Sequence, residues 1–353
     1  MTRLVIIGSN SIHCKRFIQG ILDNSDYELS IITNLPMPEF TDIPQHQINF
    51  ALTNLKAKSQ IARILMQINP QVIHIHQANS YAWHSLRAIR QLSYRPQVIL
   101  TAWGSDVLLL PRENKIFERI VKFSLQNADV ITSDSLYMSG VIKSLLGKVS
   151  KPIHTINFGI QDLPGKQNLT TKKDIILSSR LHKPLYRIDK IITAFANLIH
   201  ANLIAESYTL VVSAGGEESD NLQKLAGRLQ VSDRVKFTGM LPYKDLAEYY
   251  QQAKVFVSVP ESDGTASSLL EAMAYGCIPV LSNLPANLEW IIHECNGYIT
   301  VNIDELQEEI LRALRQADNN EEYGRLYDFN YNLIQSKATL KNNMRKFLQL
   351  YHL

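Results

Sequence analysis

Short apolar runs alternate along the chain with segments whose apolar residues recur at helical spacing. The first run covers residues 4–7, the turn residue Gly8 follows it, and apolar positions then repeat with a helical period from Phe17 to Leu22. Further strands are predicted at 29–33, 72–75, 98–101 and 130–133, and further helices at 54–68, 80–92 and 114–126. Strands that alternate with helices pair through right-handed crossovers, so this half is predicted to form a parallel sheet with helices on both faces.

A polar stretch in the middle of the chain interrupts this alternation. Residues 162–173 are rich in Gly, Pro, Lys and Thr, a composition typical of linkers. Beyond them, strands are predicted at 175–178, 209–213, 235–238, 255–259 and 279–282, helices at 188–202, 222–229, 244–252 and 267–275, and mostly helical structure at 304–353. The chain is therefore predicted to form two Rossmann-like units. Because ligands of open parallel sheets bind beyond the carboxyl ends of the strands, we expect a ligand cleft between the units.

The composition is that of a folded protein of the cytoplasm. Of the 353 residues, 45% are hydrophobic and the mean hydropathy is −0.10, which excludes disordered, collagen-like and coiled-coil classes. No apolar run approaches the ~18 residues of a membrane-spanning helix, and the first apolar run is too short for a signal peptide. The three cysteines (Cys14, Cys277 and Cys295) show no paired spacing. We therefore expect a reducing cytosol, without disulfides or a structural zinc site.

The net charge of +3 hides an uneven distribution. Residues 1–160 carry +6 and the remainder −3, and residues 52–97 contain no Asp or Glu. Such asymmetry is typical of a protein with an anionic partner, for example a lipid surface, and the alternatives are chance and an ordinary solvated helix face. The basic residues that would form this surface are Lys56, Lys58, Arg63, Arg87, Arg90 and Arg95, followed by Arg112, Lys115, Arg119 and Lys122.

The stretch from 255 to 296 contains the most informative chemistry. The strand at 255–259 leads into a turn with Gly264, and a helix opens at about Ser267. The free amides and positive dipole end of such a helix start favour phosphate or other anionic oxygens. Asp263 precedes the turn and Glu271 lies about one turn into the helix, where carboxylates would accept hydrogen bonds from hydroxyl groups. This arrangement favours a nucleotide sugar, and an ordinary strand-to-helix turn is the alternative.

The run from Asp263 to Val280, DGTASSLLEAMAYGCIPV, closely resembles the signature of the GT4 glycosyltransferases. That signature pairs two acidic residues with seven residues between them, and here Asp263 takes the place of the more usual first Glu. Segments 103–107, 157–160, 178–181 and 235–239 match other family elements in the right order. The resemblance implies an α/β fold of the GT-B architecture, with two Rossmann-like domains that face each other across a cleft. It divides the chain into an acceptor-binding domain at 1–160, a linker at 161–173, a nucleotide-sugar-binding domain at 174–335, and a C-terminal helix at 336–353 that crosses back to the N-terminal domain.

The resemblance also assigns roles to donor-site residues. Glu271 would bind the ribose hydroxyls of the donor and Asp263 would face the transferred sugar. Arg180 would neutralise the diphosphate, a task suited to its fixed guanidinium fork. Asp263, Arg180 and Glu271 are thus the expected catalytic residues. The remaining expected donor contacts are Arg187, Gly239, Gly264, Thr265, Ala266 and Ser267.

The chain departs from the family pattern at two positions. Tyr186 stands where the family usually has a lysine, so Arg187, or else Lys183, is expected to supply the second cation. Trp103 stands where the family often has a histidine. The expected acceptor-site residues are Ser105, Asp106, His13 and His76, with a helix cap as the alternative role of Asp106. His74 and His76 point the same way on a strand, but without a third ligand cluster we expect no metal.

The resemblance implies a retaining, metal-independent glycosyltransferase of the hexosyl or N-acetylhexosaminyl class that needs no cofactor. The donor is expected to be UDP- or GDP-linked, and the acceptor a glycan or lipid-linked glycan of bacterial-type surface polysaccharide or glycolipid synthesis. No nucleic-acid partner is expected, and the basic surface predicts peripheral attachment to an anionic membrane. A glycosyltransferase-like binding subunit without activity and a nucleotide-sugar epimerase are the alternatives. Glu261 competes with Asp263 for the sugar contact, but the seven-residue spacing favours Asp263.

Overall fold

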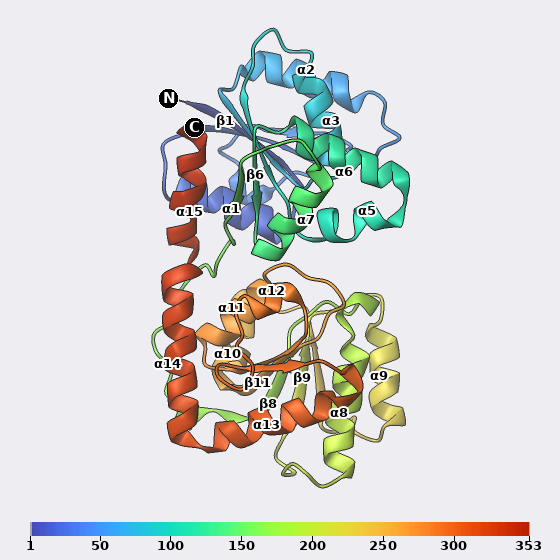
Figure 1. Ribbon diagram of the computed structural model, residues 1–353, viewed down its shortest axis with the longest axis vertical. Coiled ribbons are helices and arrows are strands. Elements are labelled where there is room, and N and C mark those ends of the chain that lie inside the picture. The colour runs from blue at the N-terminus through green and yellow to red at the C-terminus, as the bar shows by residue number, and fades with distance from the viewer. Residues whose placement is uncertain (1, 353) are drawn as a thin grey trace. The chain divides into compact units, whose positions relative to one another are not determined.

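The computed structural model describes residues 2–352 and divides the chain into two compact units. Unit 1 runs to Gln161 and takes in the chain again from Leu340, while unit 2 is Asp162–Thr339. Each unit contains one parallel sheet with helices on both faces (Figure 1). The stretch predicted as a linker packs within unit 2, where the Gln167 amide donates to the Tyr327 hydroxyl over 2.8 Å.

Unit 1 is built on a seven-stranded sheet in the order β3-β2-β1-β4-β5-β6-β7, and neighbouring strands are parallel. Its strands are β1 (Arg3–Gly8), β2 (Glu28–Thr33), β3 (Gln45–Gln47), β4 (Val72–His76), β5 (Gln97–Thr101), β6 (Val130–Ser133) and β7 (Ile153–Thr155). Its α-helices are α1 (Ile12–Leu22), α2 (Ala57–Ile68), α3 (Ser80–Ile89), α4 (Ser105–Leu108), α5 (Leu110–Glu113), α6 (Lys115–Asn127), α7 (Leu136–Leu146) and α15 (Leu340–Gln349). Short 3₁₀ helices lie at Pro38–Phe40 and Leu350–His352.

Alternate residues of the strands in unit 1 bury opposite faces of the sheet. On β1, Val5 and Ile7 belong to the core shared with α2, α3, α6 and α7, whereas Leu4 and Ile6 belong to the core shared with α1 and α15. Both faces of a parallel sheet are covered, so its central strands are apolar at nearly every position. This explains why the run at 4–7 shows no polar alternation.

The C-terminal helix α15 completes the core of unit 1 rather than that of unit 2. Phe347 packs edge-on against Phe17 of α1, with ring centroids 5.0 Å apart, and α15 lies along α1 (Figure 1). Gly20 leaves room for this approach, because a Cβ there would lie 2.8 Å from Met344 Cγ. The sequence predicted one helix over 336–353, but α14 ends at Lys337 and α15 begins at Leu340.

Unit 2 repeats the architecture with a six-stranded parallel sheet in the order β10-β9-β8-β11-β12-β13. Its strands are β8 (Lys173–Ser178), β9 (Thr209–Ser213), β10 (Val235–Gly239), β11 (Ala253–Ser258), β12 (Ile278–Ser282) and β13 (Tyr298–Thr300). Its α-helices are α8 (Ile188–His200), α9 (Ser219–Arg228), α10 (Tyr243–Gln252), α11 (Ser267–Ala274), α12 (Pro285–Leu288), α13 (Leu306–Asp318) and α14 (Asn320–Lys337), with 3₁₀ helices at Leu169–Thr171, Pro184–Tyr186 and Ile303–Glu305. The predicted fold class is confirmed in both units.

The strands that the sequence did not predict all lie at sheet edges. β3 and β7 border the sheet of unit 1 and β13 borders that of unit 2, and each is three residues long. An edge strand has one neighbour, so it needs no continuous apolar run, and the Gln-His-Gln sequence of β3 shows none. Among the helices of residues 2–352, none is both long and apolar enough to cross a membrane.

A buried lysine joins the ends of two helices in unit 2. Lys172, just before β8, donates from Nζ to the carbonyl oxygens of Tyr250 (2.9 Å), Ala253 (2.8 Å) and Tyr275 (2.8 Å). These carbonyls end α10 and α11, where a cation also complements the helix dipoles. Burial lowers the pKa of Lys172, so the ammonium depends on these bonds. Lys172 thus fixes the C-terminal end of α11.

Replacing Lys172 with Met is expected to destabilise unit 2 by about 3 kcal/mol, because three buried carbonyls lose a charged donor. The matched control is Lys173→Met at the neighbouring exposed position, expected to stay within about 0.5 kcal/mol. Urea unfolding followed by circular dichroism measures both variants. Equal stability of the two would show that the Lys172 bonds contribute nothing net.

Candidate functional site

Arg180 lies just beyond β8 and contacts the loop that leaves β11. Its Nη2 donates to Asp263 Oδ2 over 2.6 Å and its Nη1 donates to Ser268 Oγ over 3.1 Å. The guanidinium carbon lies 4.4 Å from the ring centroid of Tyr186. Only 10% of the Arg180 side chain is exposed. The structure therefore brings together Arg180, Asp263 and the start of α11 at the carboxyl edge of the sheet.

The surroundings of Arg180 keep it charged. Burial opposes the charge, but the Asp263 carboxylate and the Tyr186 hydroxyl outweigh that effect and raise the pKa of the guanidinium. Tyr186, where the family pattern has a lysine, thus supports the existing cation instead of adding a second one. An aromatic face next to a guanidinium also stabilises it by a cation–π contact.

The helix start that the sequence predicted is present and has no side-chain cap. Ala266 is the N-cap of α11, and within residues 2–352 this cap makes no side-chain hydrogen bond. The preceding turn is held from within, because the Gly264 amide donates to Asp263 Oδ1 over 3.0 Å and Trp290 Nε1 donates to Thr265 Oγ1 over 3.3 Å. The uncapped end at Ser267 leaves backbone donors for an anionic oxygen.

Glu271 lies one turn into α11 and is 5% exposed. Its charge contributes to the raised pKa of the Tyr250 and Tyr275 phenols, after the larger effect of burial. Tyr250 Oη in turn lies 2.7 Å from Ser179 Oγ, in the loop that carries Arg180. The Glu271 charge thus acts on Tyr250, whose hydroxyl contacts the loop that carries Arg180.

Two glycines shape the neighbouring loops. Gly239 ends β10 with φ of 68°, a backbone conformation that residues with side chains rarely adopt, and a Cβ added there would meet no atom within 4 Å. Gly216 packs on the loop after Arg180, where a Cβ would lie 2.4 Å from the His182 carbonyl oxygen. Larger residues at Gly216 would displace that loop. The donor contact of Gly239 stays a prediction.

Arg187 binds the backbone of the loop that leaves β11. Its Nε donates to the Val259 carbonyl over 2.6 Å and its Nη2 to the Pro260 carbonyl over 3.1 Å. The role of Arg187 as a second cation for a diphosphate stays a prediction, since these bonds point the guanidinium at the end of β11. Lys183, the other option, is exposed.

In unit 1, the carboxylate of Asp106 binds backbone amides. Its Oδ2 accepts from the Ala78 amide over 2.6 Å and its Oδ1 from the Trp103 amide over 2.9 Å. Asp106 is buried, and burial raises its pKa against the opposing effect of these amides. Asp106 lies in the first turn of α4, whose N-cap is Gly104, and the neighbouring Ser105 is exposed. An acceptor contact of either residue stays a prediction.

His76 lies beneath an aromatic cluster at the end of β4. Trp103 Nε1 donates to His76 Nδ1 over 3.2 Å, so the neutral imidazole carries its proton on Nε2. That buried Nε2 has no hydrogen-bond partner among the described residues. His13 is exposed, and its ring centroid lies 5.5 Å from that of Trp103. The structure therefore gathers His13, His76 and Trp103, with His13 at the surface and His76 inside.

His74 is a core residue. Its Nδ1 lies 2.7 Å from the Tyr351 hydroxyl and its Nε2 lies 2.6 Å from Thr101 Oγ1. Both ring nitrogens are therefore engaged within the protein. Over residues 2–352, no group of three or more His, Cys, Asp or Glu side chains is placed to hold a metal ion.

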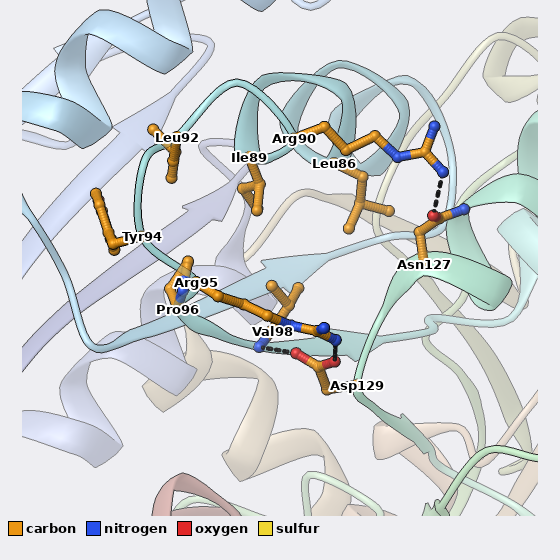
Figure 2. A pocket seen from close by; sticks show the side chains of 10 residues that line it. All are labelled: Leu86, Ile89, Arg90, Leu92, Tyr94, Arg95, Pro96, Val98, Asn127 and Asp129. Carbon is orange, nitrogen blue, oxygen red and sulfur yellow. Dashed lines mark hydrogen bonds and ion pairs between the residues drawn. The ribbon is translucent and has the colours of Figure 1, made fainter.

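A hollow of about 350 Å³ lies at the opposite edge of the unit 1 sheet, where β5 begins (Figure 2). Figure 2 shows its two arginines directed at polar partners: Arg90 Nη2 donates to Asn127 Oδ1 over 2.6 Å, and Arg95 Nη2 donates to Asp129 Oδ1 over 3.0 Å. These basic side chains are thus paired locally. The hollow lies away from the carboxyl strand ends that carry the candidate site.

The sequence missed the aromatic partners of the site. In the sequence, Tyr186 and Trp103 were recognisable only as departures from the family pattern. In the structure, Tyr186 stacks on Arg180 and Trp103 donates a hydrogen bond to His76. Tyr250, on α10, had no signal beyond its place in an amphipathic helix. A spacing of 71 residues separates it from Ser179, so only the folded chain reveals that bond.

Acid is expected to destabilise unit 1 through His74 and His76. Burial lowers the pKa of His76 from 6.5 to about 3 and that of His74 well below its usual value, so the unfolded chain takes up these protons first. The stability that this provides is complete above pH 6.5 and is lost as the pH falls toward 3. Between about pH 7 and pH 5, His76 accounts for a loss of about 2 kcal/mol, and His74 adds a loss of the same sign. Urea unfolding at both pH values checks this, with His76→Gln expected to reduce the loss by about 2 kcal/mol. An unchanged loss in His76→Gln would contradict the assignment.

Comparison with known proteins agrees with this geometry. The model of the family Glycosyl transferase 4-like matches residues 4–135, and that of Glycosyl transferases group 1 matches residues 160–327. N-acetyl-alpha-D-glucosaminyl L-malate synthase of Bacillus anthracis is 24% identical over 256 residues, which are 70% of this chain and 65% of that protein. An uncharacterized glycosyltransferase of Methanocaldococcus jannaschii is 24% identical over 325 residues, which are 83% of this chain and 81% of that protein.

Solved structures show the same fold. Sucrose-phosphate synthase from Thermosynechococcus elongatus superimposes with a TM-score of 0.82 at 16% identity and covers 100% of this chain and 98% of that one. HepE from Anabaena, in complex with UDP, also reaches 0.82 at 14% identity and covers 100% of both chains. At these identities the likeness concerns the fold, which is the GT-B architecture. The matches over both halves, together with the acidic pair at Asp263 and Glu271, show that this chain is an enzyme of the group 1 glycosyltransferases of GT4 type.

Proposed function

We propose that the enzyme moves a hexosyl or N-acetylhexosaminyl group from a UDP- or GDP-linked donor to a glycan or lipid-linked acceptor, with retention and without a metal. One observation carries the donor half of this proposal: Arg180 and Asp263 meet at the uncapped start of α11. A cation and free amides suit a diphosphate, and a carboxylate next to them suits sugar hydroxyls. The UDP in the HepE structure supports the choice of a nucleotide-linked donor.

Each donor contact in this proposal uses a group that the structure describes. Arg180 donates one guanidinium N–H to Asp263 and one to Ser268. Its other N–H groups can bind phosphate oxygens. The amides at the start of α11 take further phosphate oxygens, and Glu271 accepts from the ribose hydroxyls. Asp263, already oriented by Arg180, faces the transferred sugar. Bonds from Arg180 and from the helix amides stabilise the charge that develops on the leaving diphosphate.

The chemical step exchanges one bond at the anomeric carbon of the sugar. The acceptor hydroxyl oxygen forms the new bond on the face that the leaving group departs from, the bond to the diphosphate oxygen breaks with its electron pair, and the hydroxyl proton passes to that oxygen. No residue of the chain becomes covalently attached to the sugar in this scheme. His13, at the surface of unit 1, is the side chain that we place against the acceptor, while buried His76 supports Trp103 beneath it.

A surface in unit 1 supports attachment to an anionic membrane. Helices α2, α3 and α6 pack side by side on one face of the sheet (Figure 1). Leu55 next to Lys56 is 88% exposed and Ile116 next to Lys115 is 66% exposed. Both pairs lie where α2 and α6 begin, and helices that follow parallel strands begin at the carboxyl edge of the sheet. Exposed apolar residues flanked by lysines are typical of membrane-surface contacts.

The donor assignment predicts that Arg180→Lys lowers transfer about a hundredfold, because lysine keeps the charge but not the two-pronged geometry.

Glu271→Gln is expected to raise the donor KM about tenfold, since the carboxylate is a stronger acceptor for ribose hydroxyls than an amide. Arg228→Lys, on the exposed end of α9, is the control. Transfer and donor hydrolysis are measured with a panel of UDP-, GDP- and TDP-sugars. Binding of a donor without turnover by the wild type would instead identify a binding subunit.

The membrane proposal predicts flotation with anionic vesicles. The wild type is expected to float with phosphatidylglycerol vesicles at low salt and to be released at high salt. The double variant Leu55→Glu/Ile116→Glu is expected to stay unbound, because it removes the apolar contacts and adds repulsion. Met66→Glu, an exposed position at the other end of α2, is the control and should still bind. Absence of wild-type flotation rejects membrane attachment and leaves the donor assignment intact.

A further inference from the structure

A hollow of about 420 Å³ opens at the carboxyl ends of β11, β12 and β13 in unit 2. The loops after these strands line it together with Arg187 and Ile303, whereas Arg180, Asp263 and Glu271 are not among its lining residues. Ligands of open parallel sheets bind along this edge, and the volume falls within the range of small-molecule sites. The hollow is therefore a candidate site next to the donor site, and of the expected donor contacts it includes only Arg187.

Polar groups in this hollow have unused bonding capacity. The Glu261 amide donates to the Leu185 carbonyl over 3.0 Å, but its carboxylate makes no hydrogen bond or ion pair with another described residue. The side chain of Asn283 is likewise unpaired in the described part of the chain. Arg187 uses Nε and Nη2 on backbone carbonyls, which leaves Nη1 for a ligand. The hollow thus offers one strong acceptor and two donors.

The backbone that carries these groups is held in place. Ser282 Oγ donates to the Pro260 carbonyl over 2.9 Å, and the Asn283 amide donates to the Thr300 carbonyl over 3.1 Å. Thr300 Oγ1 donates to the Asn302 carbonyl over 2.7 Å. These bonds link the loops after β11, β12 and β13. The backbone that carries the polar side chains is therefore fixed before a ligand binds.

Aliphatic side chains complete the lining. Leu284, Val301 and Ile303 border the hollow, and Val301 is 82% exposed. An exposed valine between polar neighbours offers a small apolar surface to a ligand. The lining is therefore amphipathic, with a carboxylate, an amide, a guanidinium and an aliphatic patch.

We propose that this hollow binds a neutral sugar ring. A sugar hydroxyl donates to the Glu261 carboxylate, hydroxyl oxygens accept from Asn283 and Arg187, and the C–H face of the ring packs on Val301. A phosphate fits less well, because the Glu261 charge repels it. This proposal goes beyond the donor site, as it gives unit 2 a second place for carbohydrate. The ring is either a free sugar or one unit of a glycan.

The test is sugar binding by the full-length enzyme, measured by saturation-transfer NMR and titration. The probes are methyl α-glucopyranoside, methyl α-mannopyranoside, N-acetylglucosamine, cellobiose and cellotriose. We expect at least one probe to bind in the millimolar range, and we expect Asn283→Ala and Val301→Trp to weaken it about tenfold, by removing a donor and by filling the hollow. Leu203→Trp, an exposed position outside the hollow, is the matched control and should bind as the wild type does.

The outcomes separate this site from the donor site. Tighter binding of cellotriose than of single rings identifies a glycan as the ligand, and equal binding identifies a single sugar. Titration with UDP and GDP in parallel should give the same affinity in Val301→Trp as in the wild type. If the wild type binds neither UDP nor GDP, the donor proposal is overturned and the proposal of a sugar site is not. No binding of any probe up to about 50 mM, or binding that Val301→Trp leaves unchanged, would overturn the proposal of a sugar site.

Discussion

The ion pair between Arg180 and Asp263 joins the loops that leave two neighbouring strands, β8 and β11. The two charges are partly withdrawn from water, so each depends on the other for compensation. Their bond also fixes the turn before α11, because the same carboxylate accepts from the Gly264 amide. Tyr186 and Ser268 complete the contacts of the guanidinium. The charges, the turn and the helix start therefore form one preorganised arrangement, and a donor would meet groups that already have their positions.

The two units place different chemistry at the same edge of similar sheets. In unit 2 this edge carries a cation, carboxylates and free helix amides. In unit 1 it carries aromatic rings, with an imidazole held neutral below them and a carboxylate enclosed by amides. The aromatic rings around His76 and the charged groups around Arg180 thus differ in chemistry, and the division into donor and acceptor halves stays a prediction of the family resemblance.

Much of the fold could be predicted from local patterns, and much of the site could not. Central strands are apolar at most positions because both faces are covered, so a run such as residues 4–7 was recognisable, whereas the three-residue edge strands carry no such signal. The turn with Gly264 predicted the start of α11 at about Ser267, since this signal is local in the sequence. Arg180 and Asp263 lie 83 residues apart, so their contact depends on strand order and not on local sequence. For Asp106 the sequence was ambiguous. A carboxylate at a helix start has the same sequence pattern whether it binds a substrate or backbone amides, and here it binds amides.

Helix α15 makes unit 1 discontinuous in sequence. Phe347 of α15 and Tyr351 of the 3₁₀ helix after it fill the core beside Phe17 and His74, yet the whole of unit 2 is encoded between them and the rest of unit 1. During synthesis the ribosome must therefore release all of unit 2 before the first unit can close this face of its sheet. Until α15 is synthesised, one apolar face of the unit 1 sheet stays partly uncovered. Unit 2 is continuous in the chain and can fold as soon as it is synthesised. The order of folding is thus the reverse of the order of translation for this part of the core.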